Sequence, residues 1–537
     1  MPLYHFTEKK VHYPVPDSEV TGSYNSSLDF ILDQSTIDAL SREREVSNFF
    51  QGIRNNPEEL RAFFLSMPKG GDIHNHLTGA VYAEDLIDAA SSENLCIYSN
   101  NYTVTKCTGS QNTIPLRQAY GNERLYNSLV DAWSMKNSEL LNVSGHDQFF
   151  STFGRFGGAT GNTSLLVAEL RSRAAIDNVE YLELMTGMNT SSKASSLGNW
   201  NDNLSIYYDD LIKGGLKELA KEASINLKEI DAKSIKILDA GDPGRNVTVK
   251  YLCTVSRIKP KKEVFAQLAL AFEVANISPL AVGINILSAE DNKTAREDYS
   301  LHMLMIDFLH GKYPNVKIAL HAGELELGLV PPEDLRSHIQ EAVEVGHASR
   351  IGHGVDIMRE TNSQKTLSEM RKDKVTIEIM PVSNEEILGV SGEDHPFPIY
   401  LSRGVPIVLA SDDPGVLRTD LTEQFVIIAH TYPQVNYSDF KQFVRNSLEH
   451  SFLPGDGIWA IPGSYSQIRK ECAGCRPVTG CEECKAYLDE NEKAKAQWRL
   501  EGDLAFFESE IDDWTTFGRN GEDSSNSVEE TFLTRCI

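Results

Sequence analysis

The sequence has few basic residues for its length. Its 537 residues include 51 Lys and Arg against 77 Asp and Glu, a formal net charge of -26. A surface that binds many phosphates needs a dense basic stripe, so this excess of acid argues against nucleic acid and anionic membranes as partners. Hydrophobic residues make up 41% and charged residues 24%, as in globular chains with a large core. We expect a soluble protein whose partners are small or cationic.

Long hydrophobic runs and internal repeats are also missing. The window richest in apolar residues, 264–287, is interrupted at Glu273, Asn276, Pro279 and Asn285, so no stretch of about 18 apolar residues predicts a membrane span. The first ten residues lack the basic, apolar and small-residue parts of a secretory signal. We expect either a secreted protein whose signal was removed before this numbering begins, or a cytoplasmic one.

Ten Asn-x-Ser/Thr tripeptides favour the secreted alternative and a glycoprotein. So short a motif also arises by chance, which leaves an unmodified loop asparagine as the alternative at each site. The acceptors are Asn25, Asn101, Asn142, Asn162, Asn189, Asn203, Asn246, Asn276, Asn292 and Asn436.

Six of the eight cysteines form close pairs in the sequence. Cys96 and Cys107 bracket a polar loop that a disulfide would close. The two Cys-x-x-Cys units at 472–475 and 481–484 are five residues apart, whereas zinc knuckles are usually separated by about 12–20. We favour disulfides, with structural zinc or free thiols as alternatives, because spacing does not determine connectivity.

The chain divides by character into three parts. Residues 1–66 have helical periodicity at 27–43 and 57–66, which predicts a helical N-terminal extension. Residues 67–450 alternate short apolar runs with amphipathic stretches, in the manner of βα units, around an insertion at about 90–125. Residues 451–537 form a cysteine-containing tail with a charged helical run.

Eight apolar runs in the middle part predict strands. Such runs are typical of parallel strands that are covered on both faces, and eight of them joined by helices predict an α/β fold, a closed (β/α)8 barrel of the TIM type. The runs are 71–77, 179–185, 250–257, 281–287, 316–323, 350–354, 375–381 and 407–413.

Polar side chains gather at the C-terminal ends of these runs, where a barrel of this kind holds its active site. His74 and His76 alternate along one strand, so both imidazoles face the same side and can reach one ion. With histidines and an aspartate from other strand ends they could hold a divalent ion such as Zn²⁺ and leave a position for water. The complete set at the strand ends is His74, His76, Glu183, Asn285, Ser288, His321, Glu324, His353, Asp412 and Asp413.

Five motifs in this order resemble the adenosine deaminase family of metal-dependent hydrolases. They are Met-Pro-Lys-Gly-Gly-Asp-Ile-His-Asn-His-Leu-Thr-Gly at 67–79, His-Ala-Gly-Glu at 321–324, Arg-Ile-Gly-His-Gly at 350–354, Met-Pro-Val-Ser-Asn at 380–384 and Ser-Asp-Asp-Pro at 411–414. The helical extension, the Met-Pro-Lys-Gly lead-in and the cysteine-bracketed insertion resemble its secreted branch, the adenosine deaminase-related growth factors. The resemblance covers about residues 67–420 and also implies a homodimer contact at the N-terminal helices.

The resemblance implies a zinc-dependent hydrolytic deamination of adenosine, and of 2'-deoxyadenosine, to inosine and ammonia. One Zn²⁺ would be held by His74, His76, His321 and Asp412, with a water that attacks C6 of the purine.

The same resemblance assigns the remaining catalytic roles. Glu324 would protonate purine N1, His353 would orient and help deprotonate the water and stabilise the charge that develops, and Asp413 would bond to N7. Without the resemblance, a bland alternative for Glu324 and Asp413 is the capping of the helices that follow their strands. His338, His347 and His395 match none of the motifs and are expected to be structural or at the surface.

Four further residues are candidates for the substrate pocket. Phe149 and Phe153 are spaced as on one helix face, which usually means core, and the family places apolar residues over the nucleoside at this point. Thr78 stands where many members have an acidic residue near the ribose. Ser288 stands where many have a glycine whose N–H meets purine N3.

Two other functions remain open. An AMP deaminase of the same superfamily would need a cation for the phosphate, and the motifs offer only Arg350 and Arg418; the net charge also disfavours an anionic substrate. A growth-factor-like binding protein that has lost catalysis is disfavoured because every expected catalytic residue is present. We therefore expect a small purine nucleoside as the partner.

Overall fold

The computed structural model describes residues 34–475 and 481–511. The chain divides into a unit Met1–Ser41 and a unit Arg42–Ile537, and apart from the first residues of helix α1 the description below concerns the second. The expected boundaries at 66 and 450 and the dimer contact stay predictions. No helix among the described residues is both long and apolar enough to cross a lipid bilayer.

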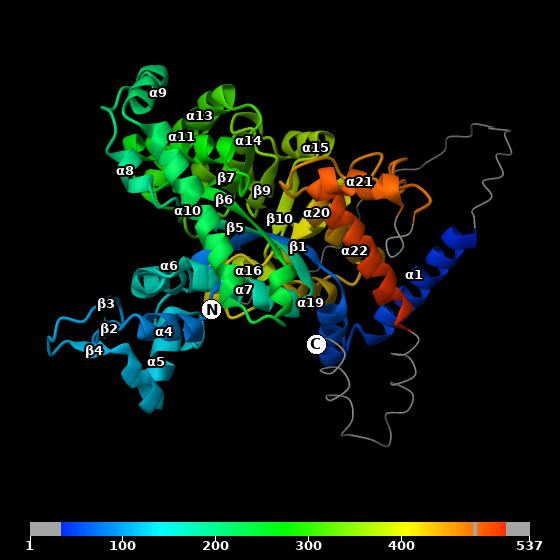
Figure 1. The fold of residues 1–537 in the computed structure, drawn as a ribbon, viewed down its shortest axis with the longest axis horizontal. Helices are drawn as coiled ribbons and strands as arrows, with labels where there is room; N and C mark the ends of the chain where they lie inside the picture. The colour runs from blue at the N-terminus through cyan, green and yellow to red at the C-terminus, as the bar shows by residue number, and fades with distance from the viewer. Residues whose placement is uncertain (1–33, 476–480, 512–537) are drawn as a thin grey trace, which may run out of the picture. The chain divides into compact units, whose positions relative to one another are not determined.

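Eight parallel strands form a barrel, as predicted (Figure 1). Each pairs with the next along the sheet, and a parallel bridge between Asn75 and Asp412 joins the first strand to the segment after the last. The strands are β1 (Gly70–His76), β5 (Val179–Thr186), β6 (Thr248–Ser256), β7 (Ala281–Leu287), β8 (Lys317–Ala322), β9 (Arg350–His353), β10 (Thr376–Ile379) and β11 (Ile407–Leu409). The (β/α)8 fold class is therefore confirmed.

The last two strands are shorter than predicted. Their apolar runs continue into Met-Pro and Ser-Asp-Asp-Pro, and Pro381 and Pro414 begin the helices α16 (Pro381–Leu388) and α18 (Pro414–Leu417). Proline lacks the N–H that a strand ladder needs but fits the first turn of a helix. The polar residues that follow these strands are thereby carried onto loops and helix starts at the barrel mouth.

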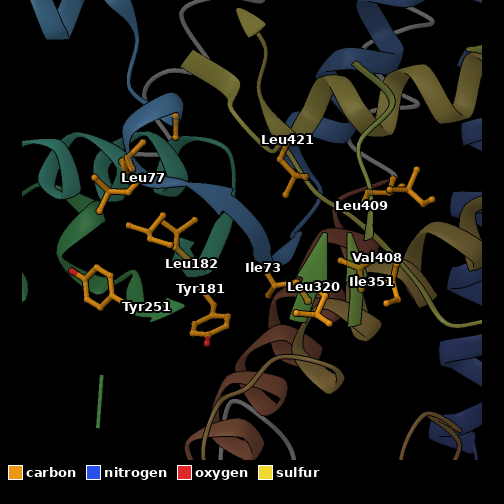
Figure 2. Close-up of a cluster of buried hydrophobic side chains, with 14 of the residues drawn as sticks. Ile73, Leu77, Tyr181, Leu182, Tyr251, Leu320, Ile351, Val408, Leu409 and Leu421 are labelled. Atoms are coloured by element: carbon orange, nitrogen blue, oxygen red, sulfur yellow. The ribbon is translucent and has the colours of Figure 1, made fainter. Parts of the chain in front are cut away.

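Helices surround the barrel and bury its outer face. The apolar window 264–287 is resolved into helix α11, which is buried along most of its length, and strand β7. Figure 2 shows buried side chains from several strands, including Ile73, Leu182, Leu320 and Ile351. The helices are α3 (Leu77–Ala80), α7 (Thr163–Ile176), α8 (Ser191–Ser195), α9 (Leu204–Lys213), α10 (Leu216–Ile237), α11 (Lys261–Ile277), α12 (Lys293–Glu297), α13 (Tyr299–Lys312), α14 (His338–Glu344), α15 (Ser363–Asp373), α17 (Phe397–Arg403), α19 (Leu421–Thr431) and α20 (Tyr437–Glu449).

A lobe is inserted between β1 and β5. It has a three-stranded antiparallel sheet of β2 (Leu95–Tyr98), β3 (Val104–Lys106) and β4 (Thr113–Pro115). A disulfide joins Cys96 to Cys107 with an S–S distance of 2.01 Å and closes the loop between β2 and β3, as predicted. The lobe's helices are α4 (Ala83–Ser92), α5 (Glu123–Trp133) and α6 (Gly145–Phe156).

Helices precede the barrel. α2 (Pro57–Ser66) has the predicted bounds, whereas α1 (Gln34–Ile53) continues ten residues beyond the predicted end at 43. The extension occurs because Val46 and Phe50 are buried, Phe50 against Phe64 and Phe440. The predicted residues 27–33 lie outside the described residues.

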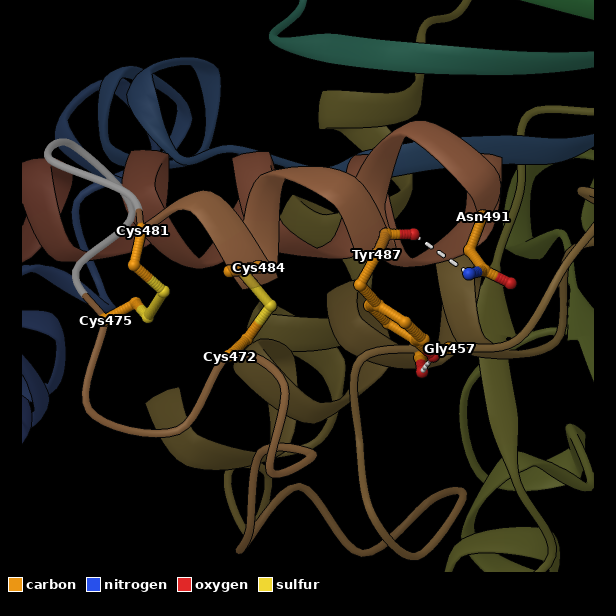
Figure 3. Close-up of a disulfide and its surroundings, with 7 residues drawn as sticks. All are labelled: Gly457, Cys472, Cys475, Cys481, Cys484, Tyr487 and Asn491. Carbon is orange, nitrogen blue, oxygen red and sulfur yellow. Dashed lines mark hydrogen bonds between the residues drawn. A yellow bond between two sulfur atoms is a disulfide. The ribbon is translucent and has the colours of Figure 1, made fainter.

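The tail cysteines form disulfides rather than a zinc site (Figure 3). Cys472 pairs with Cys484 and Cys475 with Cys481, so no thiolate of these four is left for a metal. The tail continues with α21 (Glu482–Glu490) and α22 (Glu492–Ser509). Cys253 is a buried free thiol, and Cys536 lies outside the described residues.

Candidate active site

Four histidines and an aspartate converge where the barrel strands end. His74 and His76 come from β1, where alternation turns both imidazoles to the same face. His321 lies near the end of β8, His353 ends β9, and Asp412 follows β11. These are the C-terminal ends of parallel strands, the position of active sites in (β/α)8 barrels.

The donor atoms of this cluster lie close enough to bind one cation. Oδ1 of Asp412 is 3.3 Å from Nε2 of His74 and 3.1 Å from Nε2 of His76, and the Nε2 atoms of His76 and His321 are 3.1 Å apart. His74, His321, His353 and Asp412 place donor atoms within 4.8 Å of one another. Within the described residues, Nε2 of His74 and Oδ1 of Asp412 are buried without a hydrogen-bond partner. A divalent ion would satisfy both, and imidazole with carboxylate is a donor set that suits zinc.

Two of the histidines are oriented by acceptors behind them. Nδ1 of His74 lies 2.6 Å from Oε2 of Glu378, and Nδ1 of His321 lies 2.8 Å from Oδ1 of Asn285. A neutral ring that donates Nδ1–H to its oxygen has an unprotonated Nε2 for the cluster, as metal-binding histidines require. Sequence reasoning missed Glu378, although a carboxylate inside an apolar strand signals a buried partner.

Three residues of the site have left-handed backbone conformations. The φ angles are 83° at Ser288, 68° at His353 and 64° at Asp412. Non-glycine residues adopt this region at a cost of order 1–3 kcal/mol each, and such residues cluster at active sites. The barrel therefore holds these strand ends against local backbone preference.

Glu324 lies beside the cluster and has a raised pKa. Burial raises the pKa of its carboxyl well above the ordinary value, and the negative charges of Asp412 and Glu290 raise it further. Its Oε1 lies 3.7 Å from Nε2 of His353. A carboxyl that keeps its proton at neutral pH can give it to a bound substrate. Among the described residues no helix begins at Glu324, so helix capping does not explain it.

A second glutamate holds the loop that carries this acid. The carboxylate of Glu290 accepts the backbone N–H groups of Gly323 at 3.2 Å and Glu324 at 2.9 Å, and it lies 2.6 Å from Nδ1 of His338. Burial would raise the pKa of Glu290, but Arg257 and His338 lower it overall. The ionised carboxylate of Glu290 is therefore favoured. His338 is buried as its partner and has a structural role.

Asp413 is buried beside the cluster and does not cap a helix. It precedes α18, yet its side chain makes no capping hydrogen bond. Burial, with a contribution from Asp412 and opposition from His76, raises its pKa to about 8. A Cβ atom added at Gly79 would lie 1.6 Å from Oδ1 of Asp413, so a glycine is required there for the carboxyl to occupy its position.

The pocket candidates are held by contacts other than the cluster's. Phe149 is buried and Phe153 half-buried on α6, with ring centroids 5.3 Å apart. Thr78 is half-buried on α3, and Oγ of Ser288 lies 2.8 Å from Oγ of Ser256. Within the described residues, none of the four candidates shows a hydrogen bond or ring contact to the histidines above. Their part in substrate binding stays a prediction.

Two of the charged residues expected at the strand ends lie inside the barrel. Arg350 is fully buried, with Nη2 2.6 Å from Glu183 and Nε 2.7 Å from Glu378. The expectation that Glu183 joins the group at the mouth is therefore wrong, because its carboxylate is an interior counterion. Arg418 is exposed and pairs with Glu84 at 2.6 Å.

Helix α6 is linked to the loop that follows β7. Nε2 of His146 lies 3.2 Å from Oδ1 of Asp291, and its Nδ1 lies 3.2 Å from Asp147. The hydrogen bond to Asp291 is the largest of the causes that raise the pKa of His146. This pair connects the inserted lobe to a loop of the barrel mouth.

The fold and the site define a (β/α)8 barrel with a histidine and aspartate cluster suited to a metal. A family model for adenosine deaminase matches residues 161–462, more than half of the chain. The chain therefore belongs to the adenosine deaminase family. The matched range contains His321, His353 and Asp412, and the His74 and His76 pair precedes it.

Curated relatives are adenosine deaminases of other organisms. That of Clostridium perfringens is 31% identical over 137 residues, which is 25% of this chain and 38% of that protein. That of Mycobacterium sp. (strain KMS) is 26% identical over 231 residues, 41% of this chain and 59% of that protein. These matches span less than two thirds of the bacterial relatives. The adenosine deaminase of Lutzomyia longipalpis is 25% identical over 433 residues, 74% of this chain and 77% of that protein.

Two solved structures with some likeness are titled as deaminases. The N6-methyl-AMP deaminase of Arabidopsis thaliana has a TM-score of 0.47 and 17% identity over 73% of this chain and 94% of that chain. The adenine deaminase of Arthrobacter aurescens has a TM-score of 0.46 and 18% identity over 72% of this chain and 94% of that chain.

The His146 pair generates a pH prediction. Because its pKa is raised above 6.5, the link to Asp291 is complete below that value and is lost as pH rises through the raised pKa. Asp291→Asn should lower the pKa of His146 toward 6.5, although Asp147 remains as a weaker partner. A histidine-selective NMR titration measures this change. Asp307→Asn, which breaks the separate pair with His347, should leave it unaltered, and an unchanged titration in Asp291→Asn would contradict the assignment.

Proposed function

We propose that the protein is a zinc-dependent adenosine deaminase, which converts adenosine, and 2'-deoxyadenosine, to inosine and ammonia. The observation that carries this proposal is the joint presence at one barrel mouth of a cluster of donor atoms that could hold a cation and of Glu324, the pKa of which is raised well above its ordinary value. A hydrolytic deamination needs both, because water must be activated as a nucleophile and the ring must gain a proton as its aromaticity is lost.

His74, His76, His321 and Asp412 would hold one Zn²⁺. Their nitrogens and carboxylate match the preference of this borderline ion, and Glu378 and Asn285 support two of the ligands from behind. When bound, zinc supplies water activated for attack at neutral pH.

The other groups act on the purine. The Glu324 carboxyl gives its proton to N1 and so stabilises the ring that is attacked at C6. Burial raises the pKa of Asp413 to about 8, which favours the protonated carboxyl, and in that form it can donate to N7, an acceptor. The bond between C6 and the amino nitrogen breaks, the amino group leaves as ammonia with a proton from the attacking water, and the oxygen of that water remains on C6, which gives inosine.

A nucleoside fits the charges around the mouth better than a nucleotide does. Three arginines on loops or helices that follow strands are each paired with a carboxylate, and a paired arginine has little attraction left for a phosphate. The pairs are Arg296 with Asp334, Arg359 with Glu326, and Arg418 with Glu84. AMP is therefore the second candidate substrate.

We also propose that the protein is secreted and glycosylated. The described residues contain three disulfides, which persist in oxidising compartments. Several sequons lie on exposed positions, such as Asn101 and Asn142. The intact mass of protein from its native source should fall after glycosidase treatment. An unchanged mass would mean that the sequons no longer support the proposal.

The substrate is tested by following the loss of the adenosine absorbance band with purified protein. We expect turnover of adenosine that a chelator abolishes and added zinc restores, with AMP turned over more slowly in parallel. If neither adenosine nor AMP is turned over, the proposed deaminase activity is refuted. Faster turnover of AMP than of adenosine would establish AMP as the substrate.

The acid is tested by Glu324→Gln. The amide keeps the size of the side chain but has no acidic proton, so kcat should fall by about 10²–10⁴-fold while the zinc content measured by mass spectrometry is unchanged. Glu326→Gln is a matched control two residues further on, where the side chain pairs with Arg359. An active Glu324→Gln enzyme would show that another group supplies the proton.

A further inference from the structure

A chain of hydrogen bonds runs from a helix start to His353. The backbone N–H of Phe397 donates to Nδ1 of His395 at 3.0 Å. Nε2 of His395 lies 2.9 Å from Oδ1 of Asn384, whose Nδ2 lies 3.0 Å from Nδ1 of His353. The side chains of His353, Asn384 and His395 are all buried, with at most 4% of each residue exposed. Water therefore does not compete for these bonds.

The direction of every bond in this chain follows from its first donor. A backbone N–H can only donate, so Nδ1 of His395 accepts and its ring proton is on Nε2. That proton needs an acceptor, so Asn384 turns its oxygen toward His395 and its NH₂ group toward His353. Nδ1 of His353 accepts from this amide, and the single proton of the neutral ring is therefore on Nε2.

We propose that Asn384 and His395 are positioning residues that keep the proton of His353 on Nε2. This proton makes His353 chemically different from the proposed metal ligands beside it. His74 and His321 donate through Nδ1 to oxygen atoms and present a bare Nε2, whereas His353 presents an N–H and cannot bind a cation through that atom.

The consequence for the reaction rests on the proposed deamination. Nε2 of His353 lies 3.7 Å from Oε1 of Glu324 and, within the described residues, is buried without a hydrogen-bond partner. It can donate a hydrogen bond to the attacking oxygen and stabilise the charge that develops there. In this neutral tautomer it cannot take a proton from water, so its part is that of a donor.

This chain of hydrogen bonds is tested by variants that reverse or remove its donors and acceptors. In Asn384→Asp the carboxylate, nearly identical in size, cannot donate to Nδ1 and should draw the His353 proton to that atom. His395→Leu removes both the acceptor and the donor, whereas the amide of His395→Gln can replace both. We expect kcat to fall by about 10–100-fold in Asn384→Asp and His395→Leu, with KM and zinc content unchanged, and to be largely rescued in His395→Gln.

The tautomer itself is read by long-range ¹H–¹⁵N spectra of the zinc-loaded protein labelled at histidine nitrogens. The wild type should show a protonated Nε2 and a bare Nδ1 at His353, and Asn384→Asp should show the reverse. A protonated Nδ1 in the wild type, or equal kcat in the three variants and the wild type, would overturn the proposal. Because the spectra need no substrate, a wild type that fails to deaminate adenosine refutes the proposed function and not the tautomer. His347→Leu, remote from this chain of hydrogen bonds, should change neither readout.

Discussion

Closure of the barrel is the constraint on which the site depends. The first strand and the segment after the last are joined by N–H of His76 to the carbonyl of Asp412 at 2.8 Å, and by N–H of Asp412 to the carbonyl of His74 at 3.0 Å. The side chain of Ser411 donates to Asp72 across the same seam. Three residues that close the barrel, His74, His76 and Asp412, therefore also contribute side chains to the cation cluster. Any loosening of this seam would separate donors that must lie within a few ångströms of one another.

A series of buried charged side chains inside the barrel also holds the donor atoms of the cluster in position. His74 is held by Glu378, which is held by Arg350, which is held in turn by Glu183. The guanidinium also lies over the ring of Phe452 at 3.9 Å. Buried ion pairs are costly to desolvate and contribute little net stability compared with apolar packing. We attribute these buried ion pairs to the orientation of His74. Each charged group in the series holds the next one in place, and the last of them holds the imidazole in one orientation.

The strands and the groups at their ends could be predicted, because a covered parallel strand is a continuous apolar run and a polar residue at its end is visible in one sequence. The interior partners could not. Glu183 is expected at the mouth from its position in an apolar run, but β5 continues to Thr186, so its carboxylate lies within the strand and pairs with Arg350 inside the barrel. The partner of His353 is 31 residues away at Asn384. The partner of His74 is 304 residues away, and no spacing rule connects them. Disulfide connectivity in the tail likewise required the fold.

The four histidines at the mouth show why residue type alone does not determine role. His74 and His353 are both buried imidazoles within one cluster, and a list of residue types and positions would offer either as a ligand. What distinguishes them is whether the group behind Nδ1 accepts or donates. A carboxylate behind His74 frees Nε2 to bind a cation, whereas the amide of Asn384 behind His353 leaves a proton there. The polarity of that amide is imposed by the backbone N–H of Phe397, near the start of α17. The chemistry of a side chain at the mouth is thus decided by where a helix on the outside of the barrel begins.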